Sequence, residues 1–412
     1  MANVLLTPTW IVKDILRGYV NELRFAANVN REYDDRYRAD GAKVGYTVYA
    51  RLPWTPRVSR GEALQVQPLM DQTVPISITT QNQIAWTYSS ADSTMLIEEV
   101  RERRVTPAAQ AIATEVDLAG FETVYADVWN AVGTPGVTPS ANTTFMQAGA
   151  KLSYGGVPTA GRIAIVDPQA RIAMVNANLG LFNPQAQIAS AFRTGQFSGE
   201  VLGIGGWFES GNVAKHTTGT FTASTPVVNG AGQTGATLVT SGWASGATTL
   251  KRGDIFTIAG VYRVSVSSGF RSTGQLQQFV VTADISDTAG AISIPISPSI
   301  ITSGQLQTVD ASPANSAAIT VLGATSASGG TLATTVSPQS LVYHPDAFTM
   351  VAADLERNLA GAEVTRISSR IAGLSIRLVR QFQIGTDQNP SRLDILYGWA
   401  TLQPRLAARV MG

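Results

Sequence analysis

Cysteine is absent from this 412-residue chain, histidine occurs only twice, and charged residues make up only 14% of it, with a net charge of +1. Without cysteine the chain can form neither a disulfide framework nor a thiolate metal site. The near-neutral charge excludes a strongly basic nucleic-acid-binding protein and an acidic disordered tail. His216 and His344 lie far apart and outside any metal-ligand spacing, so each is interpreted as a packed or loop side chain.

Long apolar runs are missing as well. Nowhere do about eighteen apolar residues follow one another, and the N-terminus lacks a basic segment followed by an apolar one. We therefore expect a soluble protein without a signal peptide or a membrane-spanning helix. Hydrophobic residues nevertheless make up 44% of the chain, which is enough for the cores of two or three domains.

The recognised motifs of catalysis are absent too. The chain has neither a GxSxG nucleophile motif nor a P-loop, and its glycine-rich segment at 203–206 lacks a third glycine at the spacing of a dinucleotide-binding loop. An Arg-Gly-Asp tripeptide at 252–254 is better interpreted as a turn between two strands. Because no group of residues forms a catalytic constellation, we expect no enzyme, no cofactor and no metal ion.

The strongest helical signal spans residues 106–132. Thr106 and Pro107 form a helix start, and apolar residues then recur at spacings of three, four and seven. Gly133 to Gly136 end the pattern. We predict one long amphipathic helix, of a length that several other elements can pack along.

A long hairpin is predicted before this helix. Residues 43–52 and 73–88 alternate as strands do, and the segment between them is rich in proline and arginine. An isolated two-stranded ribbon is marginal in water, so its apolar side chains need a further surface. A projecting hairpin is favoured over one folded back on its own domain. The apolar side chains concerned are Trp54, Leu64, Val66, Leu69 and Met70.

The other segments alternate between helical and strand-like texture. Helices are predicted at 9–28, 92–104, 168–178 and 184–193, and strands at 162–167, 373–384 and 392–399. From residue 217 to about 340 the sequence consists mainly of Gly, Ser, Thr, Ala and Val in short alternating runs with regular turn signals. This composition predicts a small β-barrel or sandwich inserted into an α/β domain.

Four segments carry a resemblance to a known family: 193–215, 251–261, 344–355 and 392–411. Their order and spacing over nearly the whole chain resemble the major capsid proteins of tailed bacteriophages. In particular, the chain looks like the Salmonella-phage type of coat protein, which carries an inserted β-barrel.

The resemblance implies an α+β fold, the tailed-phage major capsid fold with an inserted all-β barrel domain. It implies an N-terminal arm (1–44), an extended hairpin loop (45–90), and a peripheral domain with a long spine helix (91–135). It further implies an axial α/β domain in two parts (136–217 and 341–372), the barrel domain (218–340), and closing strands (373–412).

The function implied is self-assembly into the icosahedral shell that encloses a tailed phage's double-stranded DNA. The partners implied are other copies of the chain in hexamers and pentamers, a scaffolding protein, a portal, a cement protein and, by weak non-specific contact, the packaged DNA; no membrane is involved. The location implied is the virion, assembled in the host bacterial cytoplasm. Candidate contacts between subunits are Trp54, Arg57, Arg60, Leu64, Leu69 and Met70. Candidate inner-face residues for DNA or scaffold are Arg24, Arg31, Arg36, Arg101, Arg103 and Arg104; ion pairs with nearby acidic residues are an equally good interpretation of these arginines.

Two departures from the family pattern limit this inference. Residues 50–88 contain no lysine, so we expect no isopeptide cross-link of the kind that some relatives form. The loop near 226–241 is short and uncharged, where a relative has a longer charged loop. The alternatives are an encapsulin-like compartment shell and another virion or surface protein, such as a tail-tube or adhesive β-domain protein.

Overall fold

The structure, a computed structural model, describes residues 23–31, 47–58, 62, 66–69, 71–87, 89, 106–178, 203–246, 248–286, 290–326, 330–357, 359, 361–369 and 374–412. The predicted helices at 92–104 and 184–193, and most of that at 9–28, lie outside these residues. The chain forms two compact units. The first contains residues 1–51, 73–120 and 348–402, and the second contains residues 52–72, 121–347 and 403–412.

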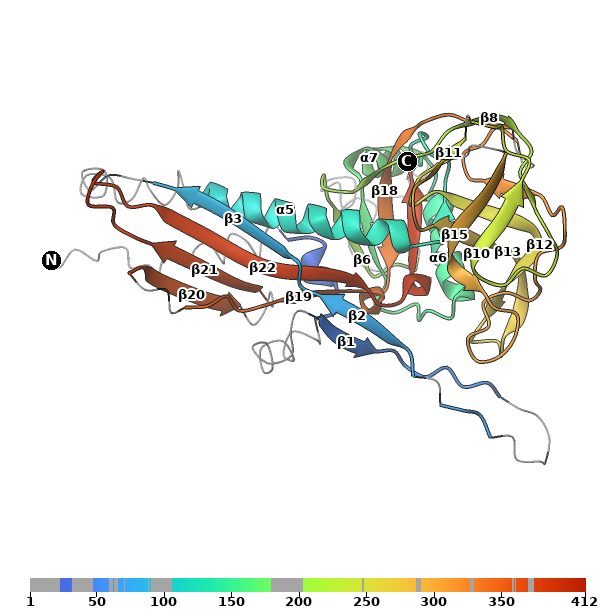
Figure 1. The fold of residues 1–412 in the computed structure, drawn as a ribbon, viewed down its shortest axis with the longest axis horizontal. Coiled ribbons are helices and arrows are strands. Elements are labelled where there is room, and N and C mark those ends of the chain that lie inside the picture. The colour runs from blue at the N-terminus through green and yellow to red at the C-terminus, as the bar shows by residue number, and fades with distance from the viewer. Residues whose placement is uncertain are drawn as a thin grey trace. The chain divides into compact units, whose positions relative to one another are not determined.

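The first unit is built on an antiparallel sheet. Strand β22 (Ser391–Thr401) pairs with β3 (Thr80–Trp86), with β21 (Leu374–Arg380) and, further along, with β19 (Phe348–Ala352). Strand β20 (Glu363–Ser369) extends the sheet beyond β21. Helix α5 (Thr106–Val124) runs along β3 and β22 (Figure 1).

The contact between α5 and the sheet depends on a glycine. A Cβ at Gly120 would lie 2.6 Å from ring atoms of Trp399 on β22 and 3.0 Å from Phe25. The ring of Phe25 stacks on that of Trp399, with centroids 5.0 Å apart. Only a residue without a side chain lets the helix backbone approach these rings so closely.

Asp117 of α5 holds the segment that contains the short helix η1 (Ala26–Asn28). Its buried carboxylate accepts the backbone N–H groups of Arg24, Phe25 and Ala26 at 2.7 to 3.0 Å. Burial raises the pKa of Asp117, and these three hydrogen bonds together with the charge of Arg31 oppose the shift. The carboxylate thus provides hydrogen-bond acceptors for three backbone N–H groups of this segment.

The predicted hairpin is present, but its second strand is divided. Strand β1 (Thr47–Arg51) pairs with β2 (Thr73–Ser77), whereas β3 pairs with β22 instead. The division falls at residues 78–79, which belong to neither strand, although buried and exposed side chains continue to alternate through them and Ile78 is buried. Residues 52–72, which we call the hairpin tip, belong to the second unit.

The second unit contains a mixed sheet with the strand order β4-β23-β18-β5-β6. These strands are β4 (Ala131–Val132), β23 (Ala407–Met411), β18 (Val336–Tyr343), β5 (Ile163–Val166) and β6 (Gly206–Glu209), and β7 (Lys215–Thr217) also pairs with β18. Helices α6 (Asn142–Tyr154) and α7 (Pro168–Asn178) belong to the same unit. The strand predicted at 162–167 and the helix at 168–178 are confirmed, whereas the sequence analysis missed α6.

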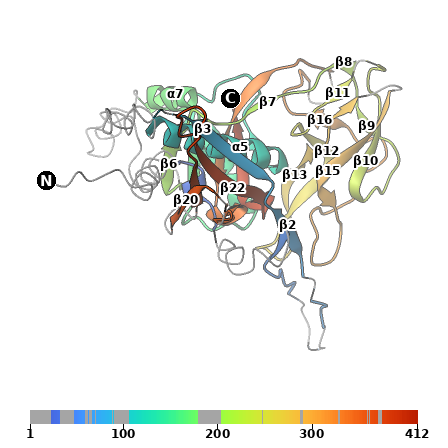
Figure 2. The same ribbon diagram turned by 60° about the vertical axis from the view of Figure 1, so that its left-hand side comes forward.

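Residues 221–332 of the second unit, which we call the barrel region, contain a partly closed six-stranded sheet. Its order is β16-β12-β13-β15-β10-β9, and its two edges meet at a bridge between Val227 and Ala318. Figure 2 shows these strands curving around one another. Their inward side chains form a core that includes Phe221, Phe256 and Phe279. The strands are β8 (Phe221–Ser224), β9 (Val227–Val228), β10 (Gly235–Ser241), β11 (Thr249–Leu250), β12 (Ile255–Ser265), β13 (Arg271–Val281), β14 (Ile285–Ser286), β15 (Ala291–Ile300), β16 (Ile319–Val321) and β17 (Gly330–Leu332).

The prediction that the long helix extends to residue 132 is wrong. The α-helix ends at Val124 and is followed by the short helix η3 (Tyr125–Asp127) and by β4. Residues 131 and 132 continue the apolar periodicity, but β4 pairs in parallel with β23, and this pairing satisfies their backbone groups. Tertiary pairing has thus overridden a helical pattern in the sequence.

We predict that Gly120→Ala lowers the free energy of unfolding by about 1–3 kcal/mol, because the added methyl group overlaps Trp399. Chemical denaturation of the unassembled subunit measures the change. Gly211→Ala is the matched control, because a Cβ there meets nothing within 4 Å. Equal stability of the two variants would contradict the proposed close packing of α5 on β22.

Candidate functional site: the root of the barrel region and the hairpin tip

The chain enters and leaves the barrel region side by side. On β7 and β18, His216 lies opposite Ser337 and Thr217 lies opposite Val336. Beyond this pairing, the Thr218 hydroxyl donates to the Ala333 carbonyl at 3.0 Å and accepts the Thr335 N–H at 2.9 Å. The two connections, which we call the root, are therefore fixed to each other.

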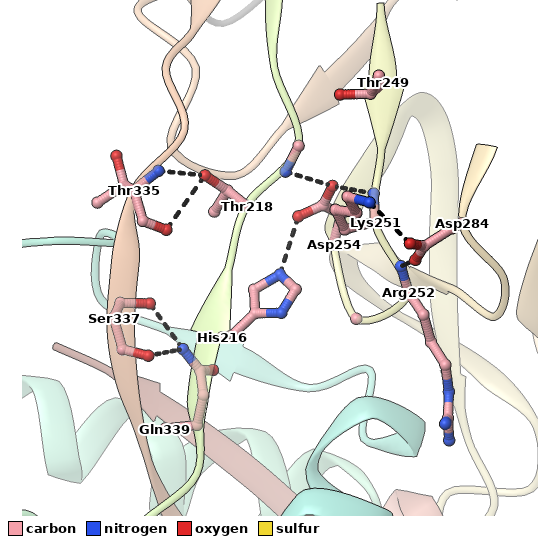
Figure 3. Close-up of polar contacts among 12 residues, drawn as sticks. His216, Thr218, Thr249, Lys251, Arg252, Asp254, Asp284, Thr335, Ser337 and Gln339 are labelled. Carbon is pink, nitrogen blue, oxygen red and sulfur yellow. Dashed lines mark hydrogen bonds and ion pairs between the residues drawn. The ribbon is translucent and has the colours of Figure 1, made fainter. Parts of the chain in front are cut away.

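The Arg-Gly-Asp tripeptide forms the predicted turn, which joins β11 to β12 and packs on the root (Figure 3). One carboxylate oxygen of Asp254 accepts from His216 Nε2 at 2.9 Å. The other accepts the N–H groups of Gly219 at 3.0 Å and Lys251 at 2.8 Å. Since a carboxylate only accepts hydrogen bonds, His216 carries its proton on Nε2. As predicted, His216 is a packed side chain.

Residues outside the barrel region also bind this turn. Arg252 forms an ion pair with Asp127 of η3 at 2.9 Å. Arg409 of β23 is fully buried and donates from Nη2 to the Gly253 carbonyl at 2.8 Å. Burial lowers the pKa of Arg409 to about 10, and Tyr125, Asp254 and Asp127 oppose this shift.

Glycine is required at the centre of the turn. Gly253 has a φ of +101°, and a Cβ there would lie 3.1 Å from the His216 ring. A side chain would therefore be strained by the backbone and crowded by the imidazole. The turn can approach the root only because this position has no side chain.

A second seam joins α6 to the barrel region through buried cations. Arg263 of β12 donates from Nη1 to Asn130 Oδ1 at 3.0 Å and to the Lys151 carbonyl at 3.1 Å. The Lys151 ammonium donates to Gln278 of β13. Burial first and the charge of Arg263 second lower the pKa of Lys151 to about 8. The carbonyls at the C-terminal end of α6 and neutral side chains thus solvate these cations.

The hairpin tip contacts the barrel region of its own chain. The Trp54 indole N–H points to Gln305 Oε1 at 3.4 Å, and Gln305 Nε2 donates to the Pro68 carbonyl at 2.9 Å. The guanidinium carbon of Arg57 lies 5.6 Å from the centre of the Phe270 ring. Apolar side chains of the tip remain exposed to solvent, Trp54 by 46% and Leu69 by 77%.

The structure describes half of the predicted subunit-contact residues. Trp54, Arg57 and Leu69 lie together on the tip, which thus has both a contact with its own chain and exposed apolar side chains. These three residues remain predicted contacts between subunits. Arg60, Leu64 and Met70 lie outside the described residues.

Of the predicted inner-face arginines, the structure describes Arg24 and Arg31. Arg24 is exposed. Arg31 donates from Nε to the Ala26 carbonyl at 3.1 Å and from Nη2 to Met350 Sδ at 3.7 Å, so its own subunit engages it. Arg36, Arg101, Arg103 and Arg104 lie outside the described residues.

Sequence reasoning missed the groups that hold the root and the tip. Asp254 was interpreted only as part of a turn, and nothing in the sequence distinguishes Gln305 from other glutamines. Within the described part of the chain, no three His, Asp or Glu side chains form a metal-binding group, and no helix is long and apolar enough to cross a membrane.

We predict that Asp254→Asn lowers the free energy of unfolding by about 2–4 kcal/mol, because an amide cannot accept all three buried hydrogen bonds. Thermal unfolding and limited proteolysis at the root measure the effect. The control is Asp284→Asn, in which an exposed partner of Lys251 is changed and a loss below about 1 kcal/mol is expected. Similar losses in both variants would contradict the role given to Asp254.

We predict that Lys151→Met stabilises the subunit at pH 7 and that this gain shrinks as the pH rises from about 8 towards 10. The pKa of Lys151 is lower in the folded than in the unfolded chain, so between about pH 8 and 10 the unfolded chain binds the proton more tightly. Raising the pH through this interval therefore stabilises the folded wild type. Denaturation at several pH values measures the difference. Lys215→Met, at an exposed position on β7, is the control; a gain for Lys151→Met that does not vary with pH would contradict the assignment.

A comparison with protein families matches residues 3–412 to the family described as "P22 coat protein - gene protein 5". No curated protein matches the chain.

Several similar solved structures come from phages. One, titled Mycobacterium phage Che8, has 15% identity and a TM-score of 0.47, with 94% of this chain and 90% of that chain covered. The capsid of Cyanophage P-SCSP1u has 13% identity and a TM-score of 0.42, with 89% and 83% covered. Mycobacterium phage Ogopogo has 10% identity and a TM-score of 0.42, with 94% and 92% covered. Because the family match spans almost every residue, the chain belongs to the P22 coat protein family and is a major capsid protein that forms a phage shell.

Proposed function

We propose that the subunit assembles into an icosahedral shell of hexamers and pentamers, and that its hairpin tip reaches a neighbouring subunit. The exposure of apolar side chains on the hairpin tip supports the proposed contact with a neighbour. The described residues of the tip form no strand of their own between β1 and β2. Val58, Val66 and Leu69 are 77% to 84% exposed. Val58 lies on the first limb of the tip, residues 52–58, and the other two lie on the second limb, residues 66–72. Apolar side chains gathered on a narrow projecting segment are typical of a surface that another molecule covers.

This proposal assigns a role to each domain of the subunit. The long helix α5 is the spine of a peripheral domain that includes residues 91–120 and the strands of 348–402. Residues 136–217 and 341–347, together with β4 and β23, form an axial domain, and 218–340 form the inserted barrel domain. Residues 1–44 are the arm, and 45–90 are the extended loop. The hydrogen bonds of Asp254 support the assignment of the barrel region as an inserted domain, because they attach it at the root, where the chain enters and leaves it.

The partners we propose are other copies of the chain, a scaffolding protein and a portal during assembly in the host bacterial cytoplasm, and a cement protein on the shell. Packaged double-stranded DNA would touch the inner face weakly. Arg24 is the better of the two described candidates for that contact, because it is exposed whereas Arg31 binds its own chain. A net charge of +1 fits weak, non-specific contact with DNA. We further propose that subunits associate without a covalent cross-link from the loop, because residues 50–88 contain no lysine.

We predict that Leu69→Asp leaves the unassembled subunit as stable as wild type and lowers the yield of closed shells at least about tenfold. The reason is that a carboxylate buried against a neighbour would be unpaired. Shells formed with the assembly proteins encoded beside this chain would be counted by negative-stain electron microscopy. Val239→Asp, which changes an exposed apolar residue of the barrel region, is the control. Normal shell yield from Leu69→Asp would contradict the proposed role of the tip, and a wild-type chain that never forms shells would contradict the assembly itself.

A further inference from the structure

Few bonds join the two sides of the hairpin tip among those of its residues that the structure describes, 52–58, 62, 66–69, 71 and 72. Beyond the β1–β2 ladder, a single backbone hydrogen bond, from Leu52 N–H to the Gln72 carbonyl at 2.9 Å, joins the limbs among the described residues. Further out, the Gln67 side chain accepts the Arg57 N–H at 3.0 Å and donates to the Arg57 carbonyl. A two-stranded segment held by so few bonds does not keep one direction in water.

A loop of the barrel region supplies the missing support. The loop at 301–308 is closed at its base, where Thr308 N–H donates to the Ile301 carbonyl at 3.0 Å and Ile301 N–H donates to Thr308 Oγ1 at 3.1 Å. On either side, Ile300 and Val309 are buried in the barrel core. The loop therefore projects from a fixed base.

Gln305 lies within this loop, is itself buried, and contacts both limbs of the tip. Towards the first limb, its side-chain oxygen faces the Trp54 indole N–H at 3.4 Å and its carbonyl accepts from Thr55 Oγ1 at 3.2 Å. Towards the second limb, its side-chain nitrogen donates to the Pro68 carbonyl at 2.9 Å and to Gln67 Oε1 at 3.2 Å. One amide group thus uses both its acceptor and its donors across the two limbs.

A second contact extends the support outwards along the first limb. Arg57 donates from Nη1 to Gln307 Oε1 at 3.5 Å, and its guanidinium packs over the Phe270 ring. The exposed apolar side chains Val58, Val66 and Leu69 lie on the same limbs and are left free by these polar contacts.

We propose that the 301–308 loop is a clamp that sets the direction of the hairpin tip in the unassembled subunit, and that Gln305 is its positioning residue. The clamp lowers the conformational entropy that the tip loses when it meets a neighbour. Its bonds are mostly between neutral polar groups, and each such bond contributes only modestly to stability, so they hold the tip and still let it shift when subunits associate. This inference rests on the proposed role of the tip in assembly.

Trypsin cleavage of the unassembled, full-length subunit tests the clamp, with mass spectrometry to identify cleavage after Arg57 or Arg60. We expect Gln305→Ala to be cleaved there at least about fivefold faster than wild type, with an unchanged far-UV circular dichroism spectrum. Gln275→Ala, a change at an exposed glutamine of the same region, is the control and should match wild type. Gln305→Glu keeps the acceptor that faces Trp54 but loses the donors. Its cleavage rate should therefore lie between those of wild type and Gln305→Ala.

Thr55→Val repeats the test from the tip side, because it removes the bond to the Gln305 carbonyl without changing the barrel region. If Gln305→Ala fails to fold, faster cleavage of Thr55→Val supports the clamp, and unchanged cleavage overturns it. Cleavage of all the clamp variants within about twofold of wild type would likewise overturn it.

Assembly gives the second readout. Under conditions in which wild type and Gln275→Ala form closed shells, Gln305→Ala should give fewer shells or shells of irregular diameter. Faster cleavage together with normal shells would overturn the positioning role. If wild type forms no shells at all, the proposed function fails, while the cleavage comparison still decides whether the clamp exists.

Discussion

The attachment of the barrel region depends on the buried carboxylate of Asp254. It accepts hydrogen bonds from a side chain of β7, from the backbone at the root, and from its own turn. A buried charge is costly unless its hydrogen bonds are satisfied, and displacement of the turn from the root would remove the bonds from His216 and Gly219 and leave this carboxylate with only the Lys251 N–H of its own turn. The barrel region is consequently fixed where the chain enters and leaves it. The buried guanidinium of Arg409 donates to the carbonyl of the same turn and adds a second contact.

A fixed root makes the polar clamp on the hairpin tip effective. The 301–308 loop rests on residues of the barrel core, and the barrel core rests on the root, so the position of Gln305 is defined within the second unit. The clamp consists mostly of hydrogen bonds between neutral polar groups, and apolar side chains of the tip stay exposed. Under the proposed role of the tip, this arrangement directs the segment before assembly and leaves its apolar side chains available for contacts with a neighbouring subunit.

Two glycines, Gly120 and Gly253, allow secondary-structure elements of this chain to pack closely. In the first unit, α5 approaches β22 through Gly120, and the rings of Phe25 and Trp399 fill the space beside it. In the second unit, Gly253 allows the turn to reach His216. At both places the absence of a side chain brings two elements together, and a polar or aromatic neighbour makes the contact specific.

The sequence by itself determined the local elements and the family. The caps and the periodicity at Thr106 predicted the start of α5, the alternating runs after residue 217 predicted the barrel-like sheet, and the order of four segments indicated a phage coat protein. These features follow from local propensity and from burial patterns along one element, which a sequence records directly. Only the tertiary structure decided where α5 ends, because the pairing of β4 with β23 joins residues far apart in the chain. The same holds for Asp254, Lys151 and Gln305. Their roles depend on partners brought together by the fold, and no local pattern in the sequence specifies such partners.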